Sequence, residues 1–328
     1  MSRRARHPAV AAVVALATCT LAACGGGPAA SAPERPRSGA AVLVETGFAP
    51  TPDLARLITT RAAASDETVV QREVRDVPGQ IQQLRTDLAP GSGLRTVVVA
   101  AMDPRATEGQ LKDVAGKDHP TVVSVLGPLA GAQAQITLAE RTVASKLAVG
   151  AATWANRHGG AGSATVIAPP DGTFDDWTVP VGRRTAQETA RALTAAGFRV
   201  RTVHALGEAD AVPAIRGSAS RVVVGWNDVT ALAAAQTLRR RPGARFVAAA
   251  GTPAPTGLAA LDALASGRLQ LLVGARLKDF ATAIVDAATT PVDAAATTSV
   301  SYALPLHAFT KALPATRAAR ADYESARR

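Results

Sequence analysis

Short β-rich runs, most of them continuously apolar, alternate with segments of helical spacing along this chain. The runs are at 41–44, 69–70, 96–101, 121–125, 164–168, 200–203, 221–224, 246–249 and 270–273. Between them apolar residues recur every three or four positions, as at Leu54, Leu57 and Ile58. Strands that are apolar on both faces need helices on both faces, so the alternation predicts an α/β fold with parallel sheets.

The alternation stops at a long helix predicted at 142–157 and then begins again. The chain has 328 residues, more than the roughly 100–200 of one domain. Two doubly wound, Rossmann-like lobes are therefore expected. In such sheets ligands bind at the carboxyl ends of the strands, where the loops converge.

The first 24 residues have the features of an export leader. Arg3, Arg4 and Arg6 precede an apolar run at 9–21, which is shorter than the roughly 20 residues of a transmembrane helix. Leu21-Ala22-Ala23-Cys24 then resembles the lipobox of bacterial lipoproteins, in which the cysteine is acylated and becomes the new N-terminus.

This leader predicts a protein held by a lipid on Cys24 at the extracytoplasmic face of the cell membrane. The alternative is an ordinary signal peptide with a chance cysteine. Cys19 would be removed with the leader, so the mature chain has neither a free thiol nor a disulfide. Residues 25–37 are rich in Gly, Ala, Pro and Ser, which is typical of a flexible tether.

The charge of the chain is strongly positive, with 36 Lys and Arg against 26 Asp and Glu, or +10. The basic residues are scattered, apart from small clusters at 239–241 and 317–328, and few aromatic residues lie among them. Nucleic acid is therefore not an expected partner. The first cluster ends a predicted helix, where cations complement the helix dipole. The second is interpreted as a solvated tail.

Motifs for catalysis, metals and cofactors are missing. There is no Gly-x-Ser-x-Gly elbow and no P-loop, and no cysteine remains as a nucleophile. No metal-ligand spacing links the histidines, which are His7, His119, His158, His204 and His307. Asp175-Asp176 and the glycines at 159–162 are interpreted as loop and turn residues. We expect neither an enzyme nor a cofactor or metal.

A resemblance to a known family is carried by five segments, at 96–126, 135–144, 221–238, 245–252 and 258–274. Residues 221–238, with Asn227-Asp228 after a strand and an alanine-rich helix next, resemble a signature of the ribose-binding and LacI-like branch of type I periplasmic substrate-binding proteins. Residues 245–252 and 258–274 resemble the segments that follow in that family. The similarity extends over about 40–304.

This resemblance implies two lobes joined by a three-strand hinge, with crossings near 135–140, 274–276 and 299–304. The implied division is a signal peptide at 1–23, a tether at 24–39, a first lobe at 40–138 with 275–304, a second lobe at 139–274 and a basic tail at 305–328.

The sequence departs from the family at its sugar ligands. The aspartate of one strand end corresponds to Ala250, and an Asp-Arg pair falls on Val125, Leu126 and Gly127. A ligand-binding arginine has no clear match, although Arg183 and Arg184 lie within a few residues of its position. Because each unmatched buried hydroxyl costs roughly 1–3 kcal/mol, we expect weak or no binding of ribose, galactose or glucose.

The candidate ligand contacts are residues at predicted strand ends and in the loops that follow. They are Phe48, Asp103, Phe174, Trp177, Trp226, Asn227 and Arg276. Structural alternatives remain open at several of these positions. Trp226 would pack under the hinge and Trp177 would lie on the surface. Asn227 or Asp228 would cap a helix, and Arg276 would be a solvated hinge residue.

These features favour a monomeric solute-binding protein that delivers a small solute to an ABC permease. The ligand expected from the remaining residues is less hydroxylated than a hexose, or has an aromatic or cationic part. The alternative is a ligand sensor or partner-binding lipoprotein with a degenerate cleft.

Overall fold

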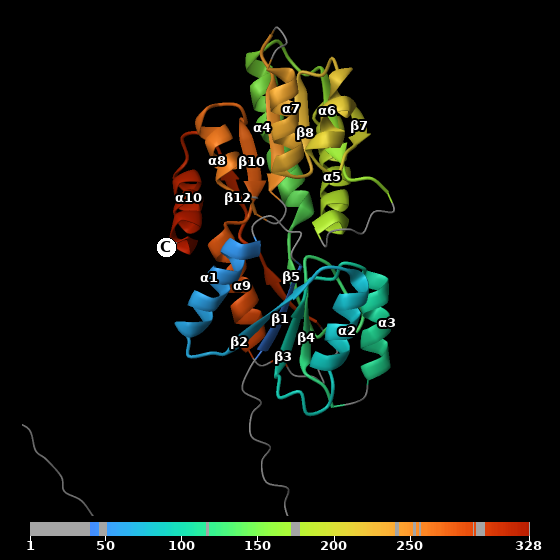
Figure 1. Cartoon of the computed structure of the whole chain (residues 1–328). Helices are drawn as coiled ribbons and strands as arrows, with labels where there is room; N and C mark the ends of the chain where they lie inside the picture. The colour runs from blue at the N-terminus through green and yellow to red at the C-terminus, as the bar shows by residue number, and fades with distance from the viewer. Residues whose placement is uncertain are drawn as a thin grey trace, which may run out of the picture. The chain divides into compact units, whose positions relative to one another are not determined.

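Two six-stranded sheets form the framework of the chain (Figure 1). The computed structural model describes residues 40–45, 51–115, 118–171, 178–239, 243–251, 254–255, 257–290, 292 and 299–327. The predictions for Phe48, Phe174, Trp177 and the leader with Cys24 lie outside these residues. All of the described residues belong to one compact unit.

The first sheet has the order β11-β5-β4-β3-β1-β2, and all its neighbours are parallel. Its strands are β1 (Ala40–Glu45), β2 (Val69–Val74), β3 (Thr96–Val99), β4 (Thr121–Val125), β5 (Ala134–Thr137) and β11 (Val300–Ala303). Every residue of β3 is buried. Val97 and Val99 join a cluster with helices on one face, while Val98 joins the cluster on the other. The continuous apolar run is explained by this two-sided burial.

The second sheet has the order β12-β10-β9-β8-β6-β7, in which only β12 is antiparallel to its neighbour. Its strands are β6 (Ser163–Ala168), β7 (Arg199–His204), β8 (Val222–Gly225), β9 (Phe246–Gly251), β10 (Leu271–Gly274) and β12 (His307–Phe309). The two doubly wound lobes expected from the sequence are confirmed.

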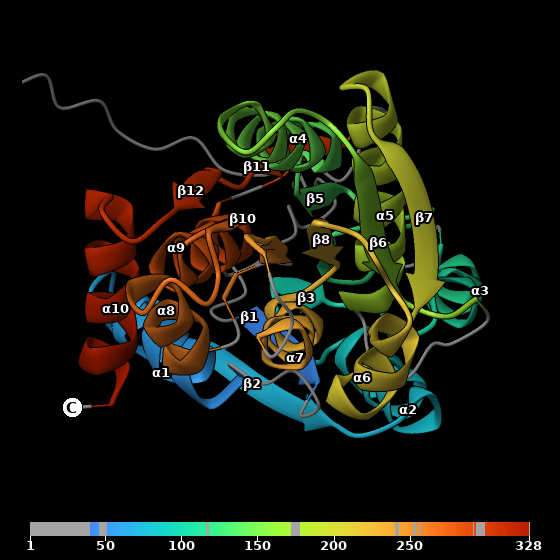
Figure 2. The same cartoon turned by 90° about the horizontal axis from the view of Figure 1, so that it is seen from above.

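Helices cover both faces of each sheet (Figures 1 and 2). The first sheet has α1 (Thr51–Ala63) and α9 (Leu277–Thr289) on one face, and α2 (Val77–Asp87) and α3 (Pro104–Val114) on the other. The second has α4 (Glu140–Arg157) with α5 (Thr178–Ala195), and α6 (Glu208–Arg216) with α7 (Asp228–Leu238) and α8 (Leu258–Ala265).

The chain passes between the sheets three times. It leaves the first sheet after β5, returns after β10 through α9, and leaves again between β11 and β12. These passages agree with the three-strand hinge expected from the sequence.

The expectation that the basic residues at the end of the chain form a solvated tail is wrong. After β12, residues Pro314–Ala326 form helix α10, which contacts α1, α8 and α9. Figure 2 shows α10 beside α8 and α1. Thr316, Ala319, Tyr323 and Ala326 recur at helical spacing in this segment and are buried, so the segment is a packed helix with its arginines outside the buried face.

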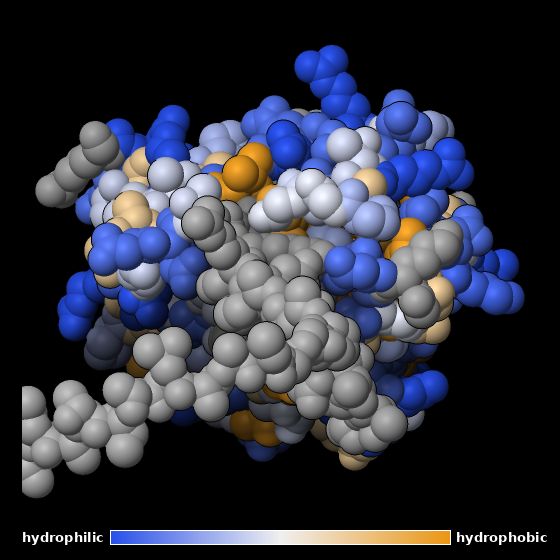
Figure 3. All heavy atoms as spheres, turned by 90° about the horizontal axis from the view of Figure 1, so that it is seen from below, coloured by the Kyte–Doolittle hydropathy of each residue, from blue (hydrophilic) through white to orange (hydrophobic). Residues whose placement is uncertain are grey.

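No helix among the described residues is long and apolar enough to cross a membrane. The coloured surface in Figure 3 is mainly hydrophilic, with small and separate apolar areas.

Candidate functional site

A cavity of about 150 Å³ lies where the loops after β3 and β4 meet helix α5. The strands belong to the first sheet and the helix covers the second, so both lobes contribute to its wall. The lining is almost entirely apolar: Ala101, Pro104, Val125, Leu126, Gly127, Pro128, Leu129, Pro180 and Arg184.

The loop after β3 is held by a buried glutamine of α2. The Gln80 side chain donates to the Ala100 carbonyl at 2.9 Å and accepts from the Met102 N–H at 2.9 Å, and no part of it is exposed. This pair of bonds replaces the strand ladder where β3 ends. Asp103 then caps α3, accepting from the N–H groups of Arg105 and Ala106.

The loop after β4 turns through an unfavourable backbone conformation. Leu126 has a φ of +59°, in the left-handed region that costs a residue with a Cβ about 1–3 kcal/mol. Its N–H donates to the Ile136 carbonyl at 2.8 Å, and its side chain is 4% exposed. This turn presents the Leu126 carbonyl to α5.

Arg184 is the charged group of the cavity. Its Nη2 donates to the Leu126 carbonyl at 2.8 Å, and its Nε donates to Glu140 Oε1 at 2.9 Å. The bond to Leu126 joins the two lobes across the cavity wall. Arg184 retains a side-chain exposure of 42%. The site therefore offers apolar surface and one partly neutralised cation.

This arrangement suits binding more than bond making. The cavity lining contains no carboxylate, histidine, lysine or hydroxyl that would act as an acid, base or nucleophile. Among the described residues no group of three His, Cys, Asp or Glu side chains is placed to hold a metal ion.

Comparison with solved structures gives the same architecture. A ribose ABC transporter protein from Conexibacter woesei matches with a TM-score of 0.64 and 15% identity, over 84% of this chain and 91% of its own. A solute-binding protein from Bacillus halodurans with bound myo-inositol matches at 0.66 and 17%, over 88% and 98%. A sugar-transport substrate-binding protein from Bordetella parapertussis matches at 0.67 and 16%, over 88% and 93%.

The chain has the type I periplasmic binding protein fold. No family model matches the sequence, and no curated protein sequence matches it at a significant level. At these identities the likeness establishes the fold alone.

Within this fold, two predicted ligand residues are helix caps. Asp103 belongs to a loop that lines the cavity, but its Oδ1 accepts two backbone N–H groups. Asn227 Oδ1 accepts from the Thr230 N–H and from the Thr230 hydroxyl, both at 2.9 Å. Asn227 does not line the cavity. Ligand contact by these two residues stays a prediction.

Trp226 is packed inside the second lobe. Its side chain is 3% exposed, and its indole N–H donates to the Ala205 carbonyl at 3.0 Å. A Cβ added at Gly182 of α5 would meet the Trp226 ring at 2.2 Å, so the indole lies directly against the helix backbone. The sequence left open packing of Trp226 under the hinge; the structure instead packs the ring against α5 inside the second lobe, where it is almost fully buried.

Arg276 is bound to α10. Its Nη2 and Nε donate to the two carboxylate oxygens of Asp322 at 2.6 and 3.0 Å. The hydrogen bond and charge of Asp322 raise the pKa of Arg276 despite its partial burial, so the pair stays ionised. Arg276 is neither a solvated hinge residue nor a lining residue of the cavity.

The cavity uses residues that sequence reasoning did not select. Gln80, Glu140 and Arg184 come from three helices, and the sequence singles out only Arg184, for its nearness to the position of the family's arginine. A buried glutamine has no local signal in sequence, because its partners are backbone groups 20 and 22 residues away.

Proposed function

We propose that this chain is an extracytoplasmic solute-binding protein of an ABC importer, which binds a small solute between its lobes. The observation that carries the proposal is the cavity at the carboxyl ends of β3 and β4, closed by α5 of the other lobe. The likeness to proteins described as sugar-binding components of ABC transporters supports it. The partner would be an ABC permease, and the chain would act as a monomer without catalysis.

The expected solute is less hydroxylated than a hexose. The cavity wall is formed by Ala, Val, Leu, Pro and Gly side chains, which leave sugar hydroxyls without hydrogen-bond partners. Arg184 supplies a cation that fits a carbonyl or carboxylate oxygen of the solute. We propose an apolar or ring-shaped body with one such polar end.

Binding is expected to use closure of the two lobes. The Arg184–Leu126 bond is made between lobes, and a solute that completes this cavity favours the closed arrangement. The three passages between the sheets are the positions where bending is expected.

The location is proposed from the leader. Acylation of Cys24 would hold the protein at the outer face of the membrane, beside its permease. With Cys24→Ala, labelled palmitate should no longer be incorporated; incorporation into the variant would contradict the anchor.

One alternative has an observation in its favour. The family's Asp-Arg pair is absent at Val125, Leu126 and Gly127, and Arg184 already has two partners. A sensor or partner-binding lipoprotein with a degenerate cleft would have these features. Neighbouring genes for a permease and an ATPase would favour transport.

A thermal-shift screen tests the proposal. Purified full-length protein is screened with monosaccharides, cyclic polyols, nucleosides, amino acids and quaternary amines. A ligand at 100 times its Kd stabilises the native state by about 2.7 kcal/mol. Arg184→Gln should abolish the shift, while Arg191→Gln, on the same helix but outside the cavity, should keep it. Strong binding of a simple hexose, or equal loss in both variants, would contradict the assigned site.

A further inference from the structure

Arginines line the edge of the second sheet where its parallel strands begin. Five loops lead into β10, β9, β8, β6 and β7, and each contains or adjoins an arginine: Arg268, Arg245, Arg221, Arg157 and Arg199. None of these loops contains an aspartate or glutamate. The edge lies at the opposite ends of the strands from those that face the ligand loops.

The strand order places these arginines in a row. Arg245 and Arg221 directly precede β9 and β8, and Arg199 is the first residue of β7. These strands are neighbours in the order β10-β9-β8-β6-β7. With about 4.8 Å between adjacent strands, the row is roughly 19 Å long. Two of its members have partners within the lobe: the Arg221 guanidinium lies 5.3 Å from the centroid of the Trp154 ring, and Arg245 Nη1 donates to the Ser220 carbonyl at 2.9 Å. We call it the arginine row.

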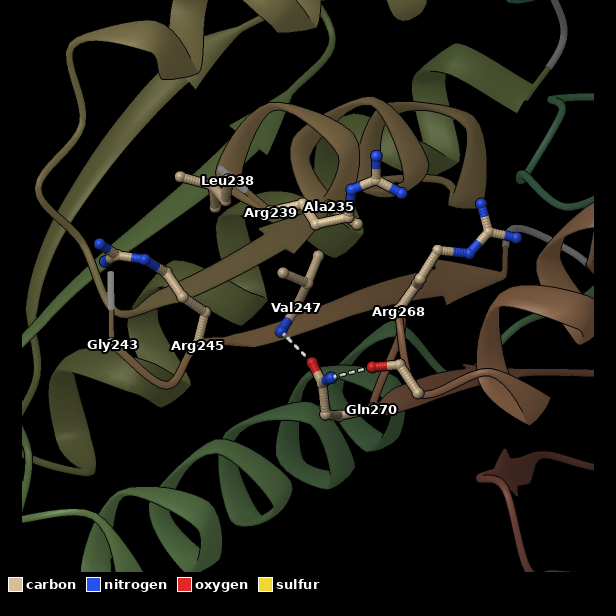
Figure 4. Close-up of a pocket in the computed structure, with 9 residues that line it drawn as sticks. Ala235, Leu238, Arg239, Gly243, Arg245, Val247, Arg268 and Gln270 are labelled. Atoms are coloured by element: carbon tan, nitrogen blue, oxygen red, sulfur yellow. Dashed lines mark hydrogen bonds between the residues drawn. The ribbon is translucent and has the colours of Figure 1, made fainter. Parts of the chain in front are cut away.

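One end of the row borders a cavity of about 220 Å³ (Figure 4). Arg239, Arg245 and Arg268 lie around it on different sides. Gln270 fixes the floor, since it accepts from the Val247 N–H at 2.6 Å and donates to the Gly267 carbonyl at 2.7 Å. The cavity holds several water-sized groups of about 30 Å³ each, which is enough for a tetrahedral oxyanion.

Helix ends do not cancel this charge. Arg239 and Arg268 follow α7 and α8, whose C-termini carry about half a negative charge each. The exposed guanidinium groups of Arg239 and Arg268 alone exceed that sum. The carboxylate in the last turn of α8, Asp262, is paired with Arg320 of α10 at 2.5 Å. In the described part of the chain, no carboxylate forms an ion pair with Arg239 or Arg268.

The overall charge of the chain does not explain the row. In the first sheet, the loop that leads into β2 contains Asp66 and Glu67, and the loop that leads into β4 contains Asp118. The first-lobe edge also contains Arg95 before β3 and Lys117 before β4, so its charge is mixed, whereas the corresponding loops of the second lobe contain arginines and no carboxylate.

We propose that the arginine row is a docking site for a linear polyanion that carries phosphate groups. Guanidinium groups bind phosphate oxygens in a bidentate manner, and a row of them matches a chain of phosphates better than a single ion. The site is separate from the solute cavity, so both would be occupied together.

A bilayer surface fits the row less well. The large apolar side chains exposed in the described residues are Val149, Val300 and Leu313, and none lies in these loops. The row therefore has no apolar group to insert among lipids, whereas a polymer needs only charge and reach.

The test compares the two ends of the row with a matched control. Arg239→Gln/Arg268→Gln removes two exposed arginines at the cavity end, and Arg157→Gln/Arg199→Gln removes two at the β6–β7 end. Arg75→Gln/Lys112→Gln removes the same charge from exposed positions of the first lobe. Affinity for inorganic polyphosphate of defined length is measured by calorimetry at several salt concentrations, with thermal unfolding as a check on folding.

Each end variant should bind polyphosphate about 30-fold more weakly, from a contribution of about fivefold per arginine near a charged surface. The salt dependence should also become shallower, since fewer counterions are released. The control should stay within about twofold of the parent protein. Orthophosphate should compete poorly.

Three results would overturn the proposal. An equal loss in the control means that only net charge matters. A loss confined to Arg239→Gln/Arg268→Gln, with efficient competition by orthophosphate, means a single-ion site. Binding to phosphatidylglycerol vesicles through the same arginines, without binding to polyphosphate, means a membrane surface.

Discussion

Truncation of Tyr323 is the most direct test of how the end of this chain is folded. Tyr323 is 1% exposed in helix α10, and its hydroxyl donates to the Pro255 carbonyl of the loop after β9. Around it, Arg327 donates to Asp53 of α1, and Arg276 is bound to Asp322. The helix therefore contacts elements of both lobes.

Tyr323→Ala should lower the free energy of unfolding by about 3–5 kcal/mol, the usual cost of removing a buried aromatic side chain. Part of this loss comes from the Pro255 carbonyl, which is left without its donor. Tyr323→Phe keeps the ring and should cost only about 1 kcal/mol. Because whole proteins are stable by about 5–15 kcal/mol, the alanine variant should be impaired but folded.

Urea denaturation followed by circular dichroism gives these values. Leu313→Ala is the matched control, since Leu313 directly precedes α10 and is 40% exposed, and its change should stay within about 0.5 kcal/mol. A loss below 1 kcal/mol for Tyr323→Ala would mean that α10 is not packed in solution. The sequence-based expectation of a solvated tail would then be restored.

Three more predictions concern the packing around the site. Burial, followed by the charges of Asp228, Asp53 and Asp322, raises the pKa of Tyr323. Because the Tyr323 hydroxyl ionises at a lower pH in the unfolded chain than in the folded one, the free energy of unfolding should stay constant up to about pH 10 and fall above it. Tyr323→Phe should show a smaller fall in pH-dependent denaturation, and identical curves would contradict the burial. Gly182→Ala should cost about 1–3 kcal/mol in the same assay because its Cβ meets the Trp226 ring, while Gly109→Ala in α3, with open space around it, should cost nothing. Asp322→Asn should lower the free energy of unfolding by roughly 2–3 kcal/mol. This is less than the loss on breaking a fully buried ion pair, because the Arg276 side chain keeps 25% exposure. An unchanged urea midpoint would refute this prediction.

The architecture was predictable because its signal is local. β3 and β4 are mostly valine and almost entirely buried, and each run predicted from 96–101 to 270–273 lies within a strand of the structure or overlaps one. Helix α9 was not predicted, although Leu277, Phe280, Ala281 and Ile284 recur on one face and are buried. Helix α10 was missed for another reason: its buried face contains no large aliphatic residue, only Thr316, Ala319, Asp322, Tyr323 and Ala326, and its arginines suggested solvent.

The candidate site was less predictable because the same residue types serve two purposes at a strand end. An aspartate or asparagine there either contacts a ligand or caps the next helix, and Asp103 and Asn227 both cap. Trp226 gave no local sign of its packing, which depends on Gly182 more than forty residues earlier in the chain. Only the three-dimensional arrangement separates these alternatives.

Arg184 shows which part of the candidate site could not be predicted from the sequence. In the family that the sequence resembles, an Asp-Arg pair stands at the end of the first-lobe strand, and here that position holds the uncharged residues Val125, Leu126 and Gly127. The structure brings a guanidinium to the same strand end from α5, 58 residues later in the chain, where it binds the Leu126 carbonyl. A cation at this position is therefore supplied from the opposite lobe. Because this contact joins the two lobes, the closure proposed above would bring the charge to the cavity wall, and no local stretch of sequence contains that information.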